Sequence, residues 1–335
     1  MPELPEVETA RRIIEKHCVG RSINKVLARE CGGGPRHGKF DNKIIGESVT
    51  EGRLVSALQG RKVLAARRRG KQLWLELSGS GPALLLHLGM SGSIAVQGAE
   101  RLAYVRYKQK DDQWPPRFTK LLLDFKGGKQ LAFADPRRFG KILLRASPEE
   151  HPPLSRLALD PVLDTLPLDD FASGLASSRL AIKALLLCQD RVVSGVGNWM
   201  ADEMLFHAKI HPATLSCDLN AAQVKKVHAA LLGVCKKACA VLADYRRFPN
   251  TWLFRYRWGK GKSAADMAES NGDKDAKKCD AALPNGSPIK FMQVGGRTTA
   301  YVPAVQGKTP KASAAKRKGE ASKIKRPAAK RQRSN

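Results

Sequence analysis

Hydrophobic and polar positions divide the first half of the chain into one helix and a series of short strands. Over residues 5–18, apolar residues recur at helical spacing with charged residues opposite, and Pro and Glu in the first turn suit a helix start. Short β-type runs separated by Gly-rich turns follow, which is typical of a sandwich or barrel. We expect strands at residues 22–28, 62–67, 72–77, 83–87, 93–96, 120–125, 130–134 and 142–145.

The periodicity becomes helical from about residue 154. Helices are expected over residues 168–176, 181–188, 199–209 and 221–242. Residues 289–306 contain two short runs around a Gly-Gly pair, which predicts a β-hairpin. The predicted fold class is therefore α+β, with an N-terminal helix and β-sandwich domain over residues 1–150 and a helical domain over residues 151–258.

Two segments lack any such periodicity. Residues 259–288 are rich in Gly, Ser, Asp and Lys and are expected to form a flexible linker. Residues 307–335 contain 11 Lys and Arg against a single acid, Glu320, with almost nothing to bury, which predicts a disordered basic tail. Its basic clusters are typical of a nuclear import signal read by an import receptor, and a nonspecific DNA-binding extension is an equal alternative.

Charge narrows the class of partner. The 335 residues include 59 Lys and Arg against 31 Asp and Glu, a formal net charge of +28, and +18 remains when the tail's +10 is set aside. With 42% hydrophobic residues the chain can bury a core, which excludes full disorder. A positive excess of this size points first to nucleic acid.

Cysteine usage and the apolar runs exclude other classes. The seven Cys are scattered without a CxxC pair, so neither a disulfide framework nor a four-Cys zinc site is expected, and a reducing compartment is favoured. No apolar run reaches the length of a membrane span, and the acidic, amphipathic N-terminus does not resemble a secretory signal. We therefore expect neither membrane association nor a bound metal or other cofactor.

Three residues could carry covalent or proton-transfer chemistry. Removal of Met1 would leave Pro2 as a free secondary amine, which can attack an electrophilic carbon. Glu3 beside it could donate or accept a proton, and Lys71, on a basic turn, could bind a phosphate or move a proton. Taken singly, a plain helix start and a solvated basic turn are the more frequent explanations of these residues.

Five residues in loops could contact a duplex. Met90, on a tight turn between glycines, could be a wedge that fills the space of an extruded base, although a core Met is the commoner alternative. Arg137 and Phe139 could contact an unpaired base and stack, whereas an Asp–Arg structural pair explains one of the two loop arginines equally well. Asn198, in a Gly-rich turn before a helix, and Arg297, at the hairpin tip, could each bind phosphate or serve only the turn.

Together these motifs resemble those of the formamidopyrimidine-DNA glycosylases. The resemblance rests on Pro2-Glu3-Leu4-Pro5-Glu6-Val7-Glu8-Thr9, Arg69-Gly70-Lys71, residues 87–93, residues 135–140 and residues 195–198, in that order along the chain. It extends from residue 1 to about residue 306, and joint occurrence of the motifs by chance is negligible. The resemblance therefore favours the functional interpretation of each residue.

The resemblance implies a bifunctional DNA glycosylase and AP lyase of base excision repair. Pro2 would attack the sugar C1′ of a flipped damaged nucleotide, expel the base and form a Schiff base. Glu3 would assist at the sugar, and Lys71 would serve as a proton donor and phosphate ligand. Strand cleavage would follow by β,δ-elimination, with damaged double-stranded DNA as the partner of a monomeric protein.

The resemblance also implies roles in DNA binding. Met90, Arg137 and Phe139 resemble the family's void-filling triplet, with Arg137 facing the orphaned base. Asn198 resembles the Asn of the helix–two-turn–helix phosphate clamp, and Arg297 resembles the hairpin Arg that contacts phosphate at the lesion.

Two departures from the bacterial pattern affect the expected substrates and metal content. The hairpin, residues 291–301, has none of the four zinc-binding Cys of bacterial members and resembles the zincless version of plant-type members. Residues 245–252 are too short for the loop that covers 8-oxoguanine, so we expect formamidopyrimidines and hydantoins to be excised better than 8-oxoguanine. The zincless hairpin and the basic tail together predict a nuclear protein of a plant or alga.

Two other classes compete with the enzyme. A noncatalytic protein could bind damaged DNA through Arg137, Asn198 and Arg297 without any reaction. A basic ribosomal or chromatin protein would need neither a wedge nor a preference for lesions. The joint presence of Pro2, Glu3 and Lys71 favours the enzyme.

Overall fold

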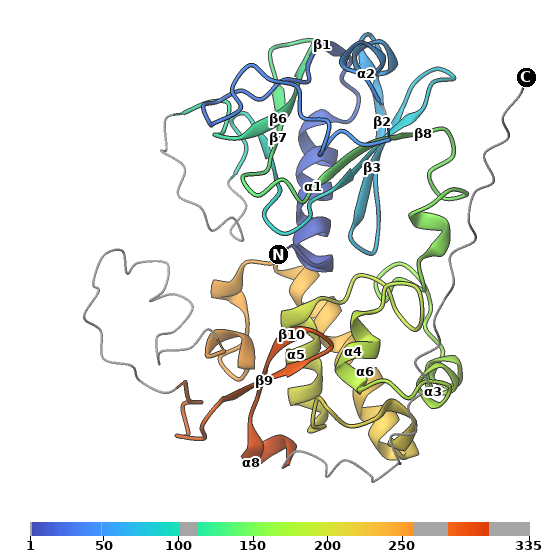
Figure 1. The fold of residues 1–335 in the computed structure, drawn as a ribbon, viewed down its shortest axis with the longest axis vertical. Helices are drawn as coiled ribbons and strands as arrows, with labels where there is room; N and C mark the ends of the chain where they lie inside the picture. Colours follow the sequence, from blue (N-terminus) through green and yellow to red (C-terminus); the bar gives the residue numbers. More distant parts are fainter. Residues whose placement is uncertain (1, 48, 101–112, 258–280, 308–335) are drawn as a thin grey trace, which may run out of the picture.

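The computed structural model describes residues 2–47, 49–100, 113–257 and 281–307 (Figure 1). Most of the expected linker and all of the basic tail from residue 308 onward lie outside the described residues. The expected β-sandwich lies at one end of the molecule and the helical domain at the other, with the N-terminus between them.

Helix α1 (Leu4–Cys18) packs against both sheets of the sandwich, with Val7, Ala10, Ile14 and Cys18 buried. Its first turn is closed by a reciprocal pair of hydrogen bonds: the Glu3 side chain accepts from a backbone N–H in the first turn, and the Glu6 side chain accepts from the Glu3 backbone N–H. The apolar spacing that predicted this helix is therefore the face that joins the two sheets.

Two four-stranded antiparallel sheets form the sandwich, in the strand orders β1-β6-β7-β5 and β2-β3-β4-β8. The strands are β1 (Ile23–Leu27), β2 (Val63–Arg69), β3 (Gln72–Leu77), β4 (Ala83–His87), β5 (Ser93–Val96), β6 (Thr119–Phe125), β7 (Gln130–Ala134) and β8 (Lys141–Arg145). Alternate residues point inward, for example Leu121, Leu123 and Phe125, because successive side chains of a strand face opposite sides. Every expected strand is present within two residues of its expected ends, and helix α2 (Glu51–Leu58) is an element that the pattern did not predict.

The second domain is helical. Its elements are η1 (Leu154–Arg156), α3 (Leu168–Ala176), α4 (Ile182–Leu187), α5 (Asn198–Ala208), η2 (Ser216–Asp218), α6 (Ala221–Ala240), η3 (Tyr245–Arg247) and η4 (Leu253–Arg255). An aromatic cluster of Trp199, Phe248, Trp252 and Phe254 closes its core. Leu4 belongs to this core although it precedes the sandwich in sequence, so the start of the chain connects the two domains.

The chain ends, within its described part, in the expected hairpin of β9 (Lys290–Val294) and β10 (Arg297–Tyr301), followed by α8 (Pro303–Gln306). Residues 281–288 of the expected linker are structured, since Ala281 is buried in a small core with the hairpin and Ala282 bridges Pro288. No helix among the described residues is long and apolar enough to cross a membrane.

Candidate active site at the domain junction

The N-terminal segment is held directly against the helical domain. Leu4 is fully buried there, and its backbone N–H donates to the Gly195 carbonyl at 3.1 Å. Pro2 is buried two positions before it. The segment that carries the candidate amine is therefore fixed to the Gly-rich turn that opens α5.

Glu3 lies on the N-terminus of α5. Its Oε1 accepts from the Trp199 N–H at 3.0 Å and its Oε2 from the Met200 N–H at 3.1 Å, which are free donors of the first helical turn. A side chain at Gly197 would overlap the Glu3 carboxyl group, so only Gly permits this close approach. Burial raises the pKa of Glu3, while Lys71 and the two N–H donors act in the opposite direction.

Glu6 is a second buried carboxylate of the site, which the sequence did not single out. Its Oε2 accepts from the Glu3 backbone N–H at 2.9 Å, and its Oε1 accepts from the Trp199 indole Nε1 at 3.0 Å. Burial, with a further contribution from the charge of Glu3, raises the pKa of Glu6 to about 7. The Glu-x-x-Glu spacing at a helix start was the available signal.

Lys71 enters the site from the turn between β2 and β3. Its Nζ donates to the Val196 carbonyl at 2.8 Å, in the same Gly-rich turn. Burial lowers the pKa of Lys71, opposed by the charges of Glu3 and Glu6. Burial and the charge of Lys71 also lower the pKa of His87, to about 4, so His87 is neutral at pH 7.

The structure thus brings together the three candidate catalytic residues, although they come from two separated stretches of sequence. A buried N-terminal Pro adjoins a carboxylate on a helix N-terminus, and a partly desolvated Lys lies across the same turn. Such a set can support nucleophilic attack by an amine together with proton transfer.

The expected wedge residues lie on two loops that a single carboxylate joins. Asp135 is fully buried, and its Oδ1 accepts from the Ser91 hydroxyl at 2.6 Å and from the Arg137 N–H at 3.2 Å. Its Oδ2 accepts from the N–H groups of Phe139 and Gly140 at 2.8 and 2.7 Å. Ser91 directly follows Met90, so its hydrogen bond to Asp135 fixes the loop of Met90 against the loop of Arg137 and Phe139.

The side chains of these loops point outward. Phe139 is 46% exposed, Arg137 is exposed with its guanidinium 5.1 Å from the Phe139 ring centre, and Met90 is half-buried and absent from the buried core. The structural Asp–Arg pair of this loop is formed by Arg138, which makes two 2.8 Å hydrogen bonds to Asp41. Arg137 is thereby left as the exposed cation of the loop.

The two expected phosphate ligands flank the site. Asn198 is the first residue of α5, and its Nδ2 donates to the Thr298 carbonyl at 2.9 Å, which ties the helix start to the hairpin. Its buried Oδ1 has no hydrogen-bond partner within the described residues. Arg297 is exposed at the start of β10, and its charge contributes to lowering the pKa of Lys71. Both residues therefore lie near Lys71, which binds the carbonyl of Val196 two positions before Asn198.

The hairpin does not fit a zinc ion. Neither β9 nor β10 carries Cys or His, and the described part of the chain holds no group of three or more His, Cys, Asp or Glu placed to bind a metal. The Gln293 side chain donates to the Thr298 hydroxyl at 3.1 Å, and Ala300 packs into a small apolar core. Packing and hydrogen bonds stabilise this hairpin.

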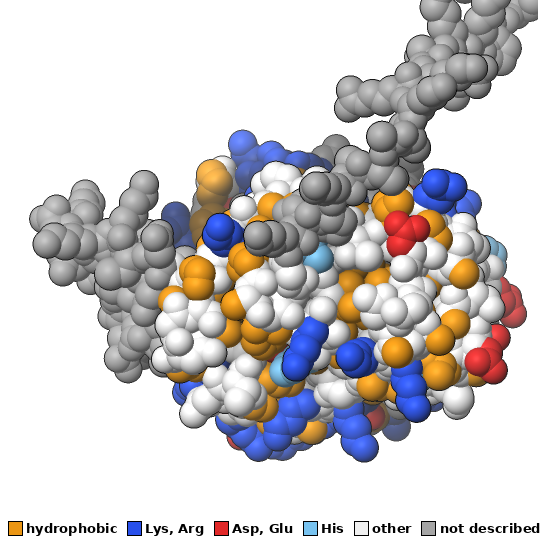
Figure 2. Space-filling view, turned by 90° about the horizontal axis from the view of Figure 1, so that it is seen from below, with side chains coloured by type: hydrophobic (Ala, Val, Ile, Leu, Met, Phe, Trp, Pro, Cys, Tyr) orange, Lys and Arg blue, Asp and Glu red, His pale blue; other side chains and the backbone are white. Residues whose placement is uncertain are grey.

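Positive charge also reaches the surface of the folded part. Figure 2 views the end of the helical domain, where Lys and Arg side chains lie across the face and along one edge and Asp and Glu are sparse. A surface of this kind favours binding of a polyanion.

Comparison with family models gives two matches. The formamidopyrimidine-DNA glycosylase N-terminal domain matches residues 1–142, and the formamidopyrimidine-DNA glycosylase H2TH domain matches residues 157–248. Together the two models cover both described domains and contain Glu3, Lys71 and Asn198.

Curated relatives and solved structures agree with the family models. The formamidopyrimidine-DNA glycosylase of Arabidopsis thaliana is 38% identical over 307 residues, which is 91% of this chain and 71% of the relative. That of Paracoccus denitrificans is 35% identical over 251 residues, covering 74% of this chain and 83% of the relative. The MutM (Fpg) structure of Thermus thermophilus matches with a TM-score of 0.62 and 28% identity over 92% of this chain and 100% of its own.

A structure of the Lactococcus lactis protein bound to DNA containing an AP site matches with a TM-score of 0.65 and 26% identity. The match covers 91% of this chain and 100% of that one.

Proposed function

The chain belongs to the formamidopyrimidine-DNA glycosylase family, a family of DNA repair, and from this premise we propose a bifunctional DNA glycosylase and AP lyase that acts through Pro2. The observation that carries the proposal is the position of Glu3 on the N-terminus of α5, directly beside the buried Pro2. A DNA-binding protein without a reaction needs no buried carboxylate and Lys beside its N-terminal amine.

The proposed reaction is the one that the family resemblance implies, carried out by the groups at the junction. Once Met1 is removed, the Pro2 nitrogen attacks C1′, the bond to the base breaks, and the base leaves with the electron pair and takes up a proton. Pro2 then loses its N–H proton, the C1′–O4′ bond breaks to give an iminium between Pro2 and C1′, and O4′ takes up a proton, for which Glu3 is the proposed donor. Loss of a proton from C2′ then expels the 3′ phosphate, and the second elimination expels the 5′ phosphate, with Lys71 as a proton donor and phosphate ligand.

In the proposal, DNA is bound by five exposed or half-buried residues on the loops, the start of α5 and the hairpin. Met90, Arg137 and Phe139 fill the space that the flipped nucleotide leaves, with Arg137 facing the orphaned base. Asn198 and Arg297 bind phosphates beside the lesion. Two of the neighbouring solved structures hold DNA with an AP site or with FAPY-dG, which supports damaged duplex DNA as the partner of this chain.

The proposed substrates are formamidopyrimidines and hydantoins, with weaker release of 8-oxoguanine. The segment that follows α6, residues 245–252, packs into the aromatic core through Phe248 and Trp252, which are 3% and 5% exposed. This packing anchors the segment at two points and supports a segment that does not close over a base. Single-turnover release of each base from otherwise identical duplexes tests the ranking, and 8-oxoguanine release as fast as the others would refute it.

The proposal also includes a monomeric protein that enters the nucleus through its basic tail. Fusion of residues 307–335 to a fluorescent protein tests the import signal, and a fusion that stays evenly distributed would refute it.

Borohydride trapping on a duplex with an abasic site is the decisive experiment for the reaction. The protein carries no N-terminal tag, and mass spectrometry first verifies that Met1 is absent. We expect a covalent adduct that maps to Pro2, and we expect Pro2→Gly to slow excision by at least about 100-fold while DNA binding is retained. A fully active Pro2→Gly protein would refute the mechanism, and no adduct from Met1-free protein would leave a noncatalytic binder of damaged DNA.

A further inference from the structure

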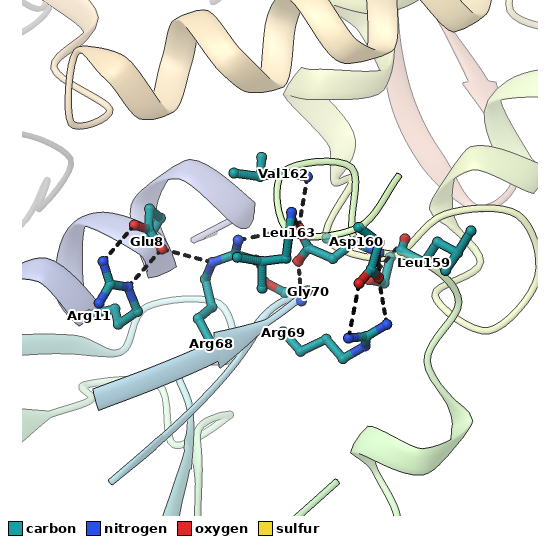
Figure 3. A network of polar contacts seen from close by, with 12 residues as sticks. Glu8, Arg11, Arg68, Arg69, Gly70, Leu159, Asp160, Val162 and Leu163 are labelled. Carbon is teal, nitrogen blue, oxygen red and sulfur yellow. Dashed lines mark hydrogen bonds and ion pairs between the residues drawn. The ribbon is translucent and has the colours of Figure 1, made fainter. Parts of the chain in front are cut away.

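A buried network of charges joins three separate segments (Figure 3) and includes the backbone of Gly70, the residue before Lys71. Arg68, near the end of β2, has a fully buried side chain that contacts Glu8 of α1 at 3.1 Å and forms an ion pair with Asp160. Its Nη1 also donates to the Gly70 carbonyl at 3.1 Å. One guanidinium thus connects the N-terminal helix, the turn before Lys71 and the loop that starts the helical domain.

Asp160 is held entirely by hydrogen-bond donors. Its Oδ2 accepts from the Gly70 N–H at 2.7 Å and from Arg68. Its Oδ1 accepts from the N–H groups of Val162 and Leu163 at 2.9 and 3.2 Å. Because every partner is a donor, a group at this position must be an acceptor on both sides, which an ionised carboxylate is and an amide is not.

The same loop also fixes the acceptor of the Lys71 ammonium. The Ser194 N–H donates to the Leu159 carbonyl at 2.9 Å, and Ser194 opens the turn whose Val196 carbonyl accepts from Lys71 Nζ. A side chain on Gly70 would lie 3.1 Å from Ser194, so the two turns are in direct contact. Residues 159 and 160 therefore set both the backbone beside Lys71 and the group that its side chain binds.

From this arrangement we infer that Asp160 is a positioning residue for the reaction of the proposed function, and that it acts through Lys71. It touches neither Lys71 Nζ nor Glu3 in the structure, and no base or sugar needs to reach it. Its effect is to fix the position of the turn at residues 70–71 of the sandwich relative to the turn at residues 194–197 of the helical domain. Lys71 is thereby kept facing Glu3 across the junction. A displacement of about 1 Å at a catalytic group can slow a reaction by about 100-fold.

The test is Asp160→Asn, with single-turnover cleavage and DNA affinity measured on the same duplex with an abasic site. An amide places N–H₂ against either the Gly70 N–H or the Val162 and Leu163 N–H groups. We expect cleavage to slow by about 10- to 100-fold, while the Kd for DNA changes less than about threefold. The matched control is Glu76→Gln, which converts the carboxylate of an exposed 3.1 Å ion pair with Arg67 on the same β2–β3 hairpin and should leave both quantities unchanged.

Rates are taken per folded molecule, at a temperature where circular dichroism shows the variant to be native. A lower Tm with a wild-type cleavage rate would show that Asp160 only stabilises the fold and would overturn the inference. For a variant that does not fold, Arg68→Lys replaces it, since one ammonium cannot serve Glu8, Asp160 and the Gly70 carbonyl together, and the same selective loss of rate is expected. Failure of the wild-type protein to cleave or form an adduct would instead refute the proposed function, on which this inference rests.

Discussion

Buried carboxylates hold two regions of the molecule in place: the domain junction, and the two loops that carry Met90, Arg137 and Phe139, called here the wedge loops. At each, a buried carboxylate accepts from backbone N–H groups. Glu3 and Asp160 accept from the opposite domain at the junction, whereas Asp135 accepts from its own loop and from the Ser91 hydroxyl of the neighbouring loop. At the junction Glu3 is buried and Lys71 is partly buried, and burial shifts the pKa of both. At the loops the carboxylate is buried, whereas Arg137 and Phe139 are exposed and Met90 is half-buried.

The difference indicates that the junction depends on electrostatics and that the wedge loops depend on shape. A proton-transferring group is useful when its protonation differs from that in water, so desolvation is part of its function. A wedge needs a rigid backbone and an exposed apolar or cationic side chain that can enter a duplex. Disturbing the junction should therefore affect rates, and disturbing the loops should affect affinity and discrimination.

The strongest test of this division is Glu3→Gln. The amide cannot accept from both the Trp199 and the Met200 N–H, and it removes the charge that faces Lys71. We expect excision to slow by about 100- to 1000-fold in single-turnover assays, with DNA affinity nearly unchanged. A comparable loss of affinity would contradict the separation of the two regions.

A smaller effect of the opposite kind is expected for Phe139→Ala. Loss of a stacking side chain should weaken binding to lesion duplex by about 1–2 kcal/mol and narrow the gap between lesion and intact duplex. Competition binding with the two duplexes measures the change. Leu64→Ala, which removes another exposed apolar side chain on the outside of β2, is the control and should behave as wild type.

Arg297→Ala should change affinity without changing discrimination. Removal of one phosphate contact should raise the Kd by about 3- to 10-fold for lesion and intact duplex alike and reduce the slope of log Kd against log salt by about 1. Lys290→Ala, at the opposite end of the same hairpin, should leave that slope unchanged. An effect confined to lesion duplex would move Arg297 into the group of wedge residues.

The last effect concerns folding stability instead of binding or rate, and it is carried by Glu6. Its pKa is about 7 in the folded protein against 4.5 for the free group, so the folded state binds the proton more tightly. The associated stability is complete below pH 4.5 and is lost as the pH rises to about 7, with a contribution of up to about 3 kcal/mol. Glu6→Gln should flatten this decline between pH 5 and 7.5 in urea unfolding, whereas Glu15→Gln, 55% exposed on the same helix, should retain it.

Much of the fold follows from local pattern. The alternation at Leu121, Leu123 and Phe125 predicted a strand with one buried face, and the structure confirms it. Boundaries shift by one or two residues because caps and turn contacts, not periodicity, end the elements. Helix α2 escaped prediction because its eight residues give too few turns for a helical period to be distinguished.

Only part of the site could be predicted from the sequence, because some of its residues lie in local motifs and others do not. Pro2, Glu3, Lys71 and Asn198 lie in compact motifs, so a reader of the sequence meets them as groups. Asp160 has no such context, since its donors Gly70 and Arg68 lie 90 and 92 positions away. Asp160 gains these contacts only when the two domains pack together, and no local sequence pattern predicts that packing.

The hydrogen bonds between Glu3 and the start of α5 span 196 and 197 positions of the chain. During synthesis, the N-terminal residues leave the ribosome long before the helix that receives them. Until that helix folds, Glu3 stays hydrated and Leu4 has no core to enter, so the N-terminal amine is an ordinary one on a solvated segment. Assembly of the proposed reactive centre therefore has to wait until the helical domain has folded.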